Sequence, residues 1–139
     1  MTFETVHCIW DYFDAPRSGI ANYGGRPHHF ASEWDERADW WKDTYSLALI
    51  DPETMQLASE QWAIWRRFAI SLKAGEATLA SHPRLPGVNP DFVALSARID
   101  QRIAAIPRKA GSVRATFRVV SIADARYWGG REVEWQDVA

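Results

Sequence analysis

The strongest constraint on the fold of this chain is a pair of helix-forming segments in the middle of the sequence. The first begins at Asp51 and Pro52, since aspartate is a good N-cap and proline is favoured at the first helical position. Apolar residues then recur at steps of three and four as far as about Lys73, and Gly75 ends the helix. The second segment begins at Asn89 and continues until Pro107 stops it. The strands of the fold must therefore come from the two ends of the chain.

Strand-forming segments do occupy both ends. They are rich in β-branched and aromatic residues, and several show the period-two alternation of a sheet with two different faces. One consequence is a polar face that sets arginines of one strand against glutamates of the last, which predicts cross-strand ion pairs between Arg114 or Arg118 and Glu132 or Glu134. The expected strands lie within residues 3–13, 17–34, 45–50, 112–122 and 131–138.

Residues 17–34 are expected to form a hairpin around Gly24 and Gly25, because two adjacent glycines readily adopt the positive φ angles of a tight turn. With this pair as the loop, Gly19 faces Phe30. Cross-strand partners share one face of the sheet, which predicts which side chains point to the core. The predicted core face holds Tyr23, Ala21, His28, Phe30 and Trp34.

The order of these segments predicts an α+β fold. We expect a mostly antiparallel sheet of about five to six strands packed against two helices, in the order β-β-β-β-α-α-β-β. The pattern leaves open whether the sheet is open or a partly closed barrel. A length of 139 residues suits one domain over residues 1–139, since a chain of this size buries enough surface for a single core.

Composition excludes several classes of protein. With 16 basic and 18 acidic residues, the net charge of −2 argues against a broadly basic nucleic-acid binder and against a polybasic membrane anchor. No apolar run approaches the ~20 residues of a membrane-spanning helix. Cys8 is the single cysteine, so no intrachain disulfide framework is possible, and the N-terminus lacks the pattern of a secretory signal. We therefore expect a cytoplasmic protein.

Motifs that would indicate a cofactor or a known type of catalysis are missing. The sequence holds no glycine-rich nucleotide loop, no nucleophile elbow, no zinc-protease motif and no cysteine pair for zinc. Adjacent residues on a strand point to opposite faces, so His28 and His29 do not form a metal pair, and Glu33 lies roughly 13 Å along the strand from His29. We predict no metal site and no cofactor.

The turn from Asp14 to Gly19 contains a candidate anion site. Arg17, flanked by Ser18, could hold a carboxylate or phosphate through its guanidinium fork and a hydroxyl group. Tyr23, further along the same strand, is added to these ligand-binding candidates. The alternative is an ordinary turn, in which the Asp14 side chain bonds the backbone of Arg17 or Ser18.

His28 is a candidate general acid or base, with Asp14 to orient it and Arg17 to hold an anionic substrate. This role requires the three side chains to converge. The alternative is a hydrogen-bonded core histidine beside Phe30.

Trp40 and Trp41 lie within residues 35–43, where six of nine residues are charged and a solvated loop is expected. A regular pattern cannot bury both tryptophans. They are therefore candidate interface residues, because tryptophan and arginine are enriched at binding hot spots. The alternative is that a tryptophan fastens the loop to its own domain.

Three segments resemble a family of small, uncharacterised bacterial proteins. They are the run WDYFDAPRSGIA from Trp10 to Ala21, the run GRPHHF from Gly25 to Phe30, and EQWAIWRR from Glu60 to Arg67. The resemblance covers most of the chain. It implies a bacterial cytoplasmic protein, and it supplies no catalytic residues.

Two classes of function stay open. The first is a binding module without catalytic activity that takes an unknown protein or a small anionic ligand, with a homodimer as one form of such binding. The second is a small hydrolase or isomerase that acts on an anionic substrate through His28 and Arg17. RNA binding through exposed aromatics and Arg114 or Arg118 is disfavoured by the acidic balance.

Overall fold

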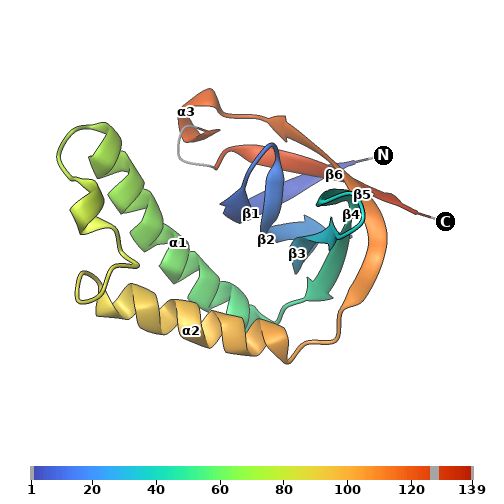
Figure 1. The fold of residues 1–139 in the computed structure, drawn as a ribbon, viewed down its shortest axis with the longest axis horizontal. Helices are drawn as coiled ribbons and strands as arrows, with labels where there is room; N and C mark the ends of the chain where they lie inside the picture. Colours follow the sequence, from blue (N-terminus) through green and yellow to red (C-terminus); the bar gives the residue numbers. More distant parts are fainter. Residues whose placement is uncertain (1, 126–128, 139) are drawn as a thin grey trace. The chain divides into compact units, whose positions relative to one another are not determined.

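A computed structural model describes residues 2–125 and 129–138 of the chain. Contacts between residues divide it into two compact units. One comprises residues 1–50 together with 106–139, and the other comprises residues 51–105. The first unit contains all the strands shown in Figure 1, and the second contains two long helices. The expectation of one domain over residues 1–139 stays a prediction.

The first unit is a closed antiparallel barrel in which each strand pairs with the next and β1 closes the ring by pairing with β6. The predicted α+β class and element order are confirmed. Of the two forms that the sequence left open, the sheet is a closed barrel. A short helix, α3, lies between the last two strands. The bounds are β1 Phe3–Tyr12, β2 Pro16–Tyr23, β3 Arg26–Asp35, β4 Trp40–Leu49, β5 Lys109–Val119, α3 Ile122–Ala125 and β6 Arg131–Asp137.

The predicted hairpin register is confirmed. Tyr23 pairs with Arg26, and Gly19 pairs with Phe30, whose side chain is completely buried. Apolar side chains from five of the strands fill the barrel interior around Phe30, where aromatic rings meet mostly edge to face. This interior core consists of Ala21, Phe30, Tyr45, Leu47, Val113 and Val133, with Val6, Tyr23, Ala115, Phe117 and Trp135 packed against it.

The alternation of faces along β1 is interrupted near its middle. Cys8 and Ile9 are neighbours that a regular strand would place on opposite faces, and both are buried. The pairing of β1 with β2 shifts register at this point, which is the signature of a bulge. Burial raises the pKa of the Cys8 thiol to about 12. The bulge brings the carbonyl of Cys8 so close to Gly19 that a Cβ atom there would lie 2.1 Å from the carbonyl oxygen.

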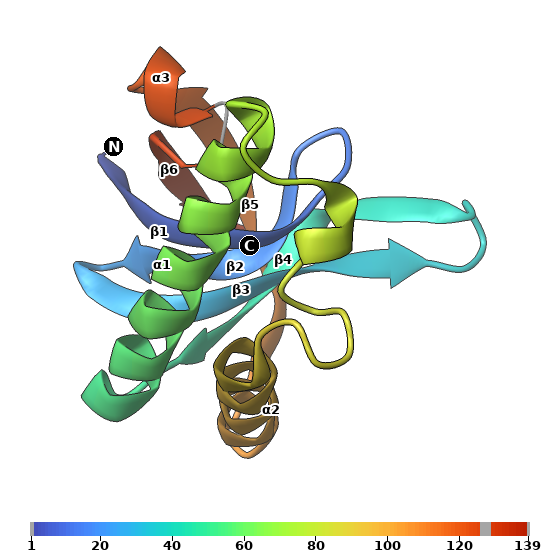
Figure 2. The same ribbon diagram turned by 90° about the vertical axis from the view of Figure 1, so that its left-hand side faces the viewer.

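The solvated loop expected over residues 35–43 is shorter than predicted. Strand β3 continues to Asp35 and β4 begins at Trp40, so only four residues form the turn. The two strands continue pairing beyond the interior core, and Figure 2 shows their hairpin projecting from the barrel. Trp34 lies on this projecting part and is 45% exposed, so its assignment to the core is wrong. Regular alternation from Phe30 predicts a core position for Trp34, but the pairing of β3 with β4 shifts register between Ser32 and Trp34.

Antiparallel pairing places the β1–β2, β3–β4 and β5–β6 connections at the same end of the barrel. This end is called the hairpin end below. The turn between β2 and β3, and the strand ends that lead into and out of the helical unit, lie at the opposite end.

The second unit contains α1 (Pro52–Lys73), a single 3₁₀ turn at Leu79–Ser81 and α2 (Pro90–Ala104). The predicted N-cap at Asp51 and the predicted start of the second helix at Asn89 are confirmed. Asp51 accepts a hydrogen bond from the backbone of Thr54, and Asn89 accepts one from the backbone of Phe92. These bonds satisfy amide groups that the first turn of a helix leaves without a partner.

The two helices are joined by polar as well as apolar contacts. Gln61 of α1 donates to the Ser96 hydroxyl of α2 at 2.7 Å, and both side chains are buried. Arg102 of α2 donates to Thr54 and to the carboxylates of Asp51 and Glu53 at the start of α1. These bonds set the position of α2 along α1. Within the described part of the chain, no helix is both long and apolar enough to cross a membrane.

Candidate functional site at the hairpin end of the barrel

Arg17 lies on β2 with its side chain turned into the hairpin end of the barrel and only 8% of the residue exposed. Its Nε and Nη2 donate to the Asp14 carboxylate at 3.0 and 2.5 Å, and its Nη1 donates to the Ser32 hydroxyl at 3.1 Å. The hydrogen bonds from Arg17 hold the pKa of the Asp14 carboxyl below its usual value. A buried arginine is stable here because a carboxylate and a hydroxyl take up its donors.

The structure therefore brings Asp14 and Arg17 together, and it engages the guanidinium fork with groups of the chain itself. The turn alternative is also refined, since Asp14 bonds the side chain of Arg17. Tyr45 supports the same corner by donating to the Pro16 carbonyl at 2.7 Å. Burial raises the pKa of this Tyr45 hydroxyl. Asp14 and Arg17 are hydrogen-bonded to each other, and Tyr45 is hydrogen-bonded to the backbone. These bonds hold the corner in place.

Ser18 does not share this corner. It is the residue after Arg17 on a strand, so it points to the other face, where its hydroxyl donates to Asp11 at 2.9 Å. The predicted pairing of Arg17 and Ser18 around a single anion is therefore not the arrangement that the structure shows.

Tyr23 and His28 lie at the opposite end of the barrel. Their rings meet edge to face at 5.4 Å between centroids. Tyr23 donates to Asp137 at 2.9 Å, and this bond raises the pKa of the Tyr23 hydroxyl. His28 Nδ1 lies 2.7 Å from the Arg26 carbonyl oxygen.

The convergence required for a His28-centred enzyme is consequently missing. Arg17 bonds Ser32, which lies four residues along β3 from His28, and four residues of extended strand span roughly 13 Å. Asp14 is held against Arg17 at the far end of this span. With β2 and β3 paired in this register, a single small substrate cannot bind Arg17 and also receive a proton from His28.

His29 is in a different environment, on the opposite face of β3 from His28. Arg108 Nη2 lies 2.5 Å from His29 Nδ1, and Arg108 also donates to Ser46. Burial, reinforced by the charge of Arg108, lowers the pKa of His29 to about 4. Among residues 2–125 and 129–138, no three histidine, cysteine or acidic side chains are placed to hold a metal ion.

The aromatic residues of the hairpin end are both exposed and mutually packed. Phe13 is 65% exposed and Trp40 is 46% exposed, and their rings meet edge to face at 5.5 Å between centroids. Trp34 and Trp41 are a cross-strand pair whose rings meet at 5.2 Å. The guanidinium of Arg17 lies 5.4 Å from the centroid of Trp41. We call Phe13, Trp34, Trp40 and Trp41 the aromatic rim.

The rim bears on the two predicted interface residues in different ways. Trp40 is nearly half exposed, and Trp41 is half-buried between Trp34 and Arg17. Trp41 therefore fits the alternative of a tryptophan that fastens its segment to the domain. Trp40 and Phe13, by contrast, present rings to solvent.

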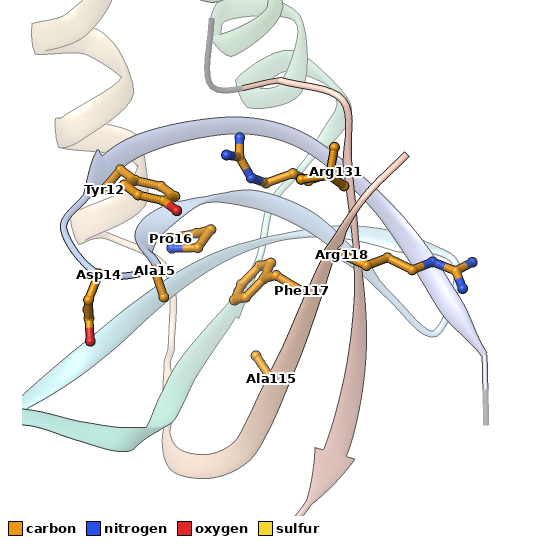
Figure 3. Close-up of a pocket in the computed structure, with 9 residues that line it drawn as sticks. Tyr12, Asp14, Ala15, Pro16, Ala115, Phe117, Arg118 and Arg131 are labelled. Atoms are coloured by element: carbon orange, nitrogen blue, oxygen red, sulfur yellow. The ribbon is translucent and has the colours of Figure 1, made fainter. Parts of the chain in front are cut away.

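A pocket of about 310 Å³ opens at the same end of the barrel, as Figure 3 shows. Its walls combine apolar and charged side chains, and they come from the β1–β2 corner, from β5 and from the start of β6. Its residues are Tyr12, Asp14, Ala15, Pro16, Ala115, Phe117, Arg118, Val119 and Arg131. Pockets of this size in the mouths of barrels commonly take small molecules.

Arg131, which sequence reasoning did not select, adds a charge to this pocket. It opens β6, where it pairs with Val119 and shares the inward face with Val133. Its guanidinium lies 5.1 Å from the centroid of the Tyr12 ring and donates to the Gly129 carbonyl at 3.3 Å. A signal in the sequence could have identified Arg131. It lies two residues before Val133 on the last strand, so alternation places the two side chains on the same face.

Comparison with known proteins adds no family to this description. No protein-family model matches the chain, and searches of curated proteins and of solved structures return no significant match. The geometry of the hairpin end therefore carries the functional argument.

Proposed function

We propose that this protein is a binding module, without catalytic activity, that recognises a partner protein through the aromatic rim. The observation that carries the proposal is the edge-to-face contact of Phe13 and Trp40, two rings that are both about half exposed or more. Tryptophan is enriched at binding hot spots, and large aromatic side chains dominate the energetics of interfaces.

The rim is suited to binding because its rings are already held in place. Phe13 and Trp40 come from different hairpins and pack on each other, and Trp41 is fixed by Trp34 and Arg17. Side chains that are ordered before binding lose little conformational entropy when a partner arrives. The location proposed for such a module is the bacterial cytoplasm, on the resemblance of its sequence and its single cysteine.

Charge indicates the chemistry of the partner. Residues 35–43, which include the tip of the β3–β4 hairpin, carry four acidic and two basic side chains, and most of them are exposed. A partner segment that presents arginine or lysine next to an apolar side chain would satisfy both features. Its cation would meet the carboxylates of the tip and the faces of the tryptophan rings, and its apolar side chain would cover Phe13.

The proposal can be tested by selecting a phage-displayed library of random 12-residue peptides on the full chain. The selected peptides are expected to combine basic and apolar residues. Substituting Trp40→Ala or Phe13→Ala should weaken their binding, measured by titration calorimetry, by about tenfold or more.

Leu79→Ala is the matched control, because Leu79 is a large exposed apolar residue of the helical unit. The Leu79→Ala variant should bind the selected peptides as tightly as the unmodified protein does. The proposal is overturned if no peptide is enriched over an empty support, or if enriched peptides bind the Trp40 and Phe13 variants as tightly as the unmodified protein.

A further inference from the structure

The pocket at the hairpin end is lined by three charged side chains, Asp14, Arg118 and Arg131, and they differ in how their charges are balanced. The Asp14 carboxylate is paired with Arg17. Arg118 donates to Glu132 at 2.8 Å, and its guanidinium lies 3.7 Å from the centroid of the Phe3 ring, pointing away from the pocket centre in Figure 3. Arg131 contacts a backbone carbonyl and the Tyr12 ring. Of the three charged side chains, Arg131 is the one without an ion-pair partner among residues 2–125 and 129–138.

An inward-facing arginine at the mouth of a barrel is costly unless something balances its charge. Arg17 shows how the fold meets this requirement, since it too faces inward at this end and has both a carboxylate and a hydroxyl. Among the residues that the structure describes, Arg131 has neither a carboxylate nor a hydroxyl partner, and it is half-buried. A carboxylate matches the planar guanidinium fork, which can donate two parallel hydrogen bonds to its two oxygens.

The rest of the pocket describes the body of the ligand. Apolar surface in the pocket comes from Pro16, Ala115, Phe117 and Val119. The Tyr12 ring stands beside Arg131 (Figure 3). The carboxylate of Asp14 lies away from Arg131 across the pocket in Figure 3. A ligand with one anionic group would therefore turn that group to Arg131 and lay its apolar part on Phe117.

We propose that this pocket binds a small molecule with a planar apolar body and one carboxylate, which Arg131 receives. The site is independent of the aromatic rim, because the pocket shares none of the four rim residues. The proposal gives the anion-binding role to Arg131, because the donors of Arg17 are taken up by Asp14 and Ser32.

The test uses two probes of the same shape, 2-naphthoate and its uncharged analogue 2-naphthamide, titrated into the isotopically labelled full chain and followed by NMR. We expect 2-naphthoate to bind about tenfold or more tightly than the amide, since hydrogen bonds to charged groups are worth more than neutral ones. Its binding should shift the amide signals of Ala115, Phe117 and Arg131.

Variants separate the role of Arg131 from a general attraction to positive charge. Arg131→Gln should remove the preference for the acid over the amide, and Arg131→Lys should keep part of it. Arg118→Gln, at the other arginine of the pocket, should keep all of it. The spectrum of each variant reports directly whether it is folded.

Three results would overturn the proposal. They are the absence of binding by either probe, equal binding of acid and amide to the unmodified protein, and a preference that survives unchanged in Arg131→Gln. None of these bears on the aromatic rim, whose test uses different residues and different probes.

Discussion

The guanidinium of Arg17 lies 5.4 Å from the centroid of the Trp41 ring. This buried cation of β2 thus contacts β4, and it also contacts β3 and the β1–β2 corner. Arg17 itself is on β2, its hydroxyl partner Ser32 is on β3, and Trp41 is on β4. Its carboxylate partner Asp14 comes from the β1–β2 corner. The geometry of the aromatic rim therefore depends on an arginine that is nearly inaccessible to a partner.

Replacing Arg17 by alanine is expected to destabilise the barrel. The change removes hydrogen bonds to Asp14 and Ser32 and the contact with Trp41, and the free energy of unfolding should fall by about 2 kcal/mol. Urea unfolding measures this loss. Arg118→Ala is the control, because its exposed ion pair with Glu132 is worth about 1 kcal/mol or less. Equal losses in the two variants would show that Arg17 has no special structural role.

The ion pair also predicts a pH dependence. Hydrogen bonds from Arg17 lower the pKa of Asp14 in the folded protein, so the stability they contribute is present above the unfolded pKa of about 3.9. That stability is lost as the pH falls through the lower pKa of the folded state. The difference in the free energy of unfolding between the unmodified protein and Asp14→Asn should therefore shrink as the pH drops from neutral to about 3. A difference that stays constant over this range would contradict the assignment.

Gly19→Ala is expected to be strongly destabilising. A Cβ atom at this position would lie 2.1 Å from the Cys8 carbonyl oxygen, so the bulged strand β1 must move. Displacements of this kind typically cost about 1–3 kcal/mol. Thermal or urea unfolding tests the prediction, with Ser18→Ala at the neighbouring, opposite-facing position as the control. If Gly19→Ala is as stable as Ser18→Ala, β1 and β2 do not approach each other this closely.

His29 should titrate with a midpoint near pH 4, because burial and the charge of Arg108 lower its pKa to about that value from 6.5. Between the two values the unfolded chain binds a proton that the folded protein does not, so stability should decline as the pH falls from about 6.5 to about 4. NMR of the imidazole carbon-bound protons follows the titration. Replacing His29 by glutamine should flatten the decline. An imidazole midpoint close to 6.5 would show that His29 is solvated.

Most of the fold could be predicted because its signals are local. The helix starts at Asp51 and Asn89 depend on capping bonds that span only three residues. The register of the β2–β3 hairpin follows from its two-residue glycine turn. Alternation along the last two strands also predicted the ion pair between Arg118 and Glu132, which is present. Arg114, by contrast, pairs with Asp43 of β4.

The candidate site was harder to predict because its residues are brought together by closure of the barrel. Sequence reasoning placed Asp14, Arg17 and His28 in one hypothetical site because an imidazole, a carboxylate and a guanidinium have complementary chemical roles. Complementary chemistry does not fix position, and the pairing of β2 with β3 places Arg17 and His28 toward opposite ends of the barrel. Arg131, more than a hundred residues from Tyr12 in the chain, is the residue that closure brings beside it.

The sequence by itself determined the α+β class, the element order, the helix caps and the hairpin register, because each of these depends on bonds or side-chain periods within a few residues. Only the tertiary structure decided that the sheet closes, that Trp34 projects beyond the core, and that Arg17 is balanced within the chain while Arg131 faces a pocket. The physical reason is that burial and charge balance are properties of all the segments around a side chain. At the hairpin end those segments come from six strands that meet only once the barrel has formed.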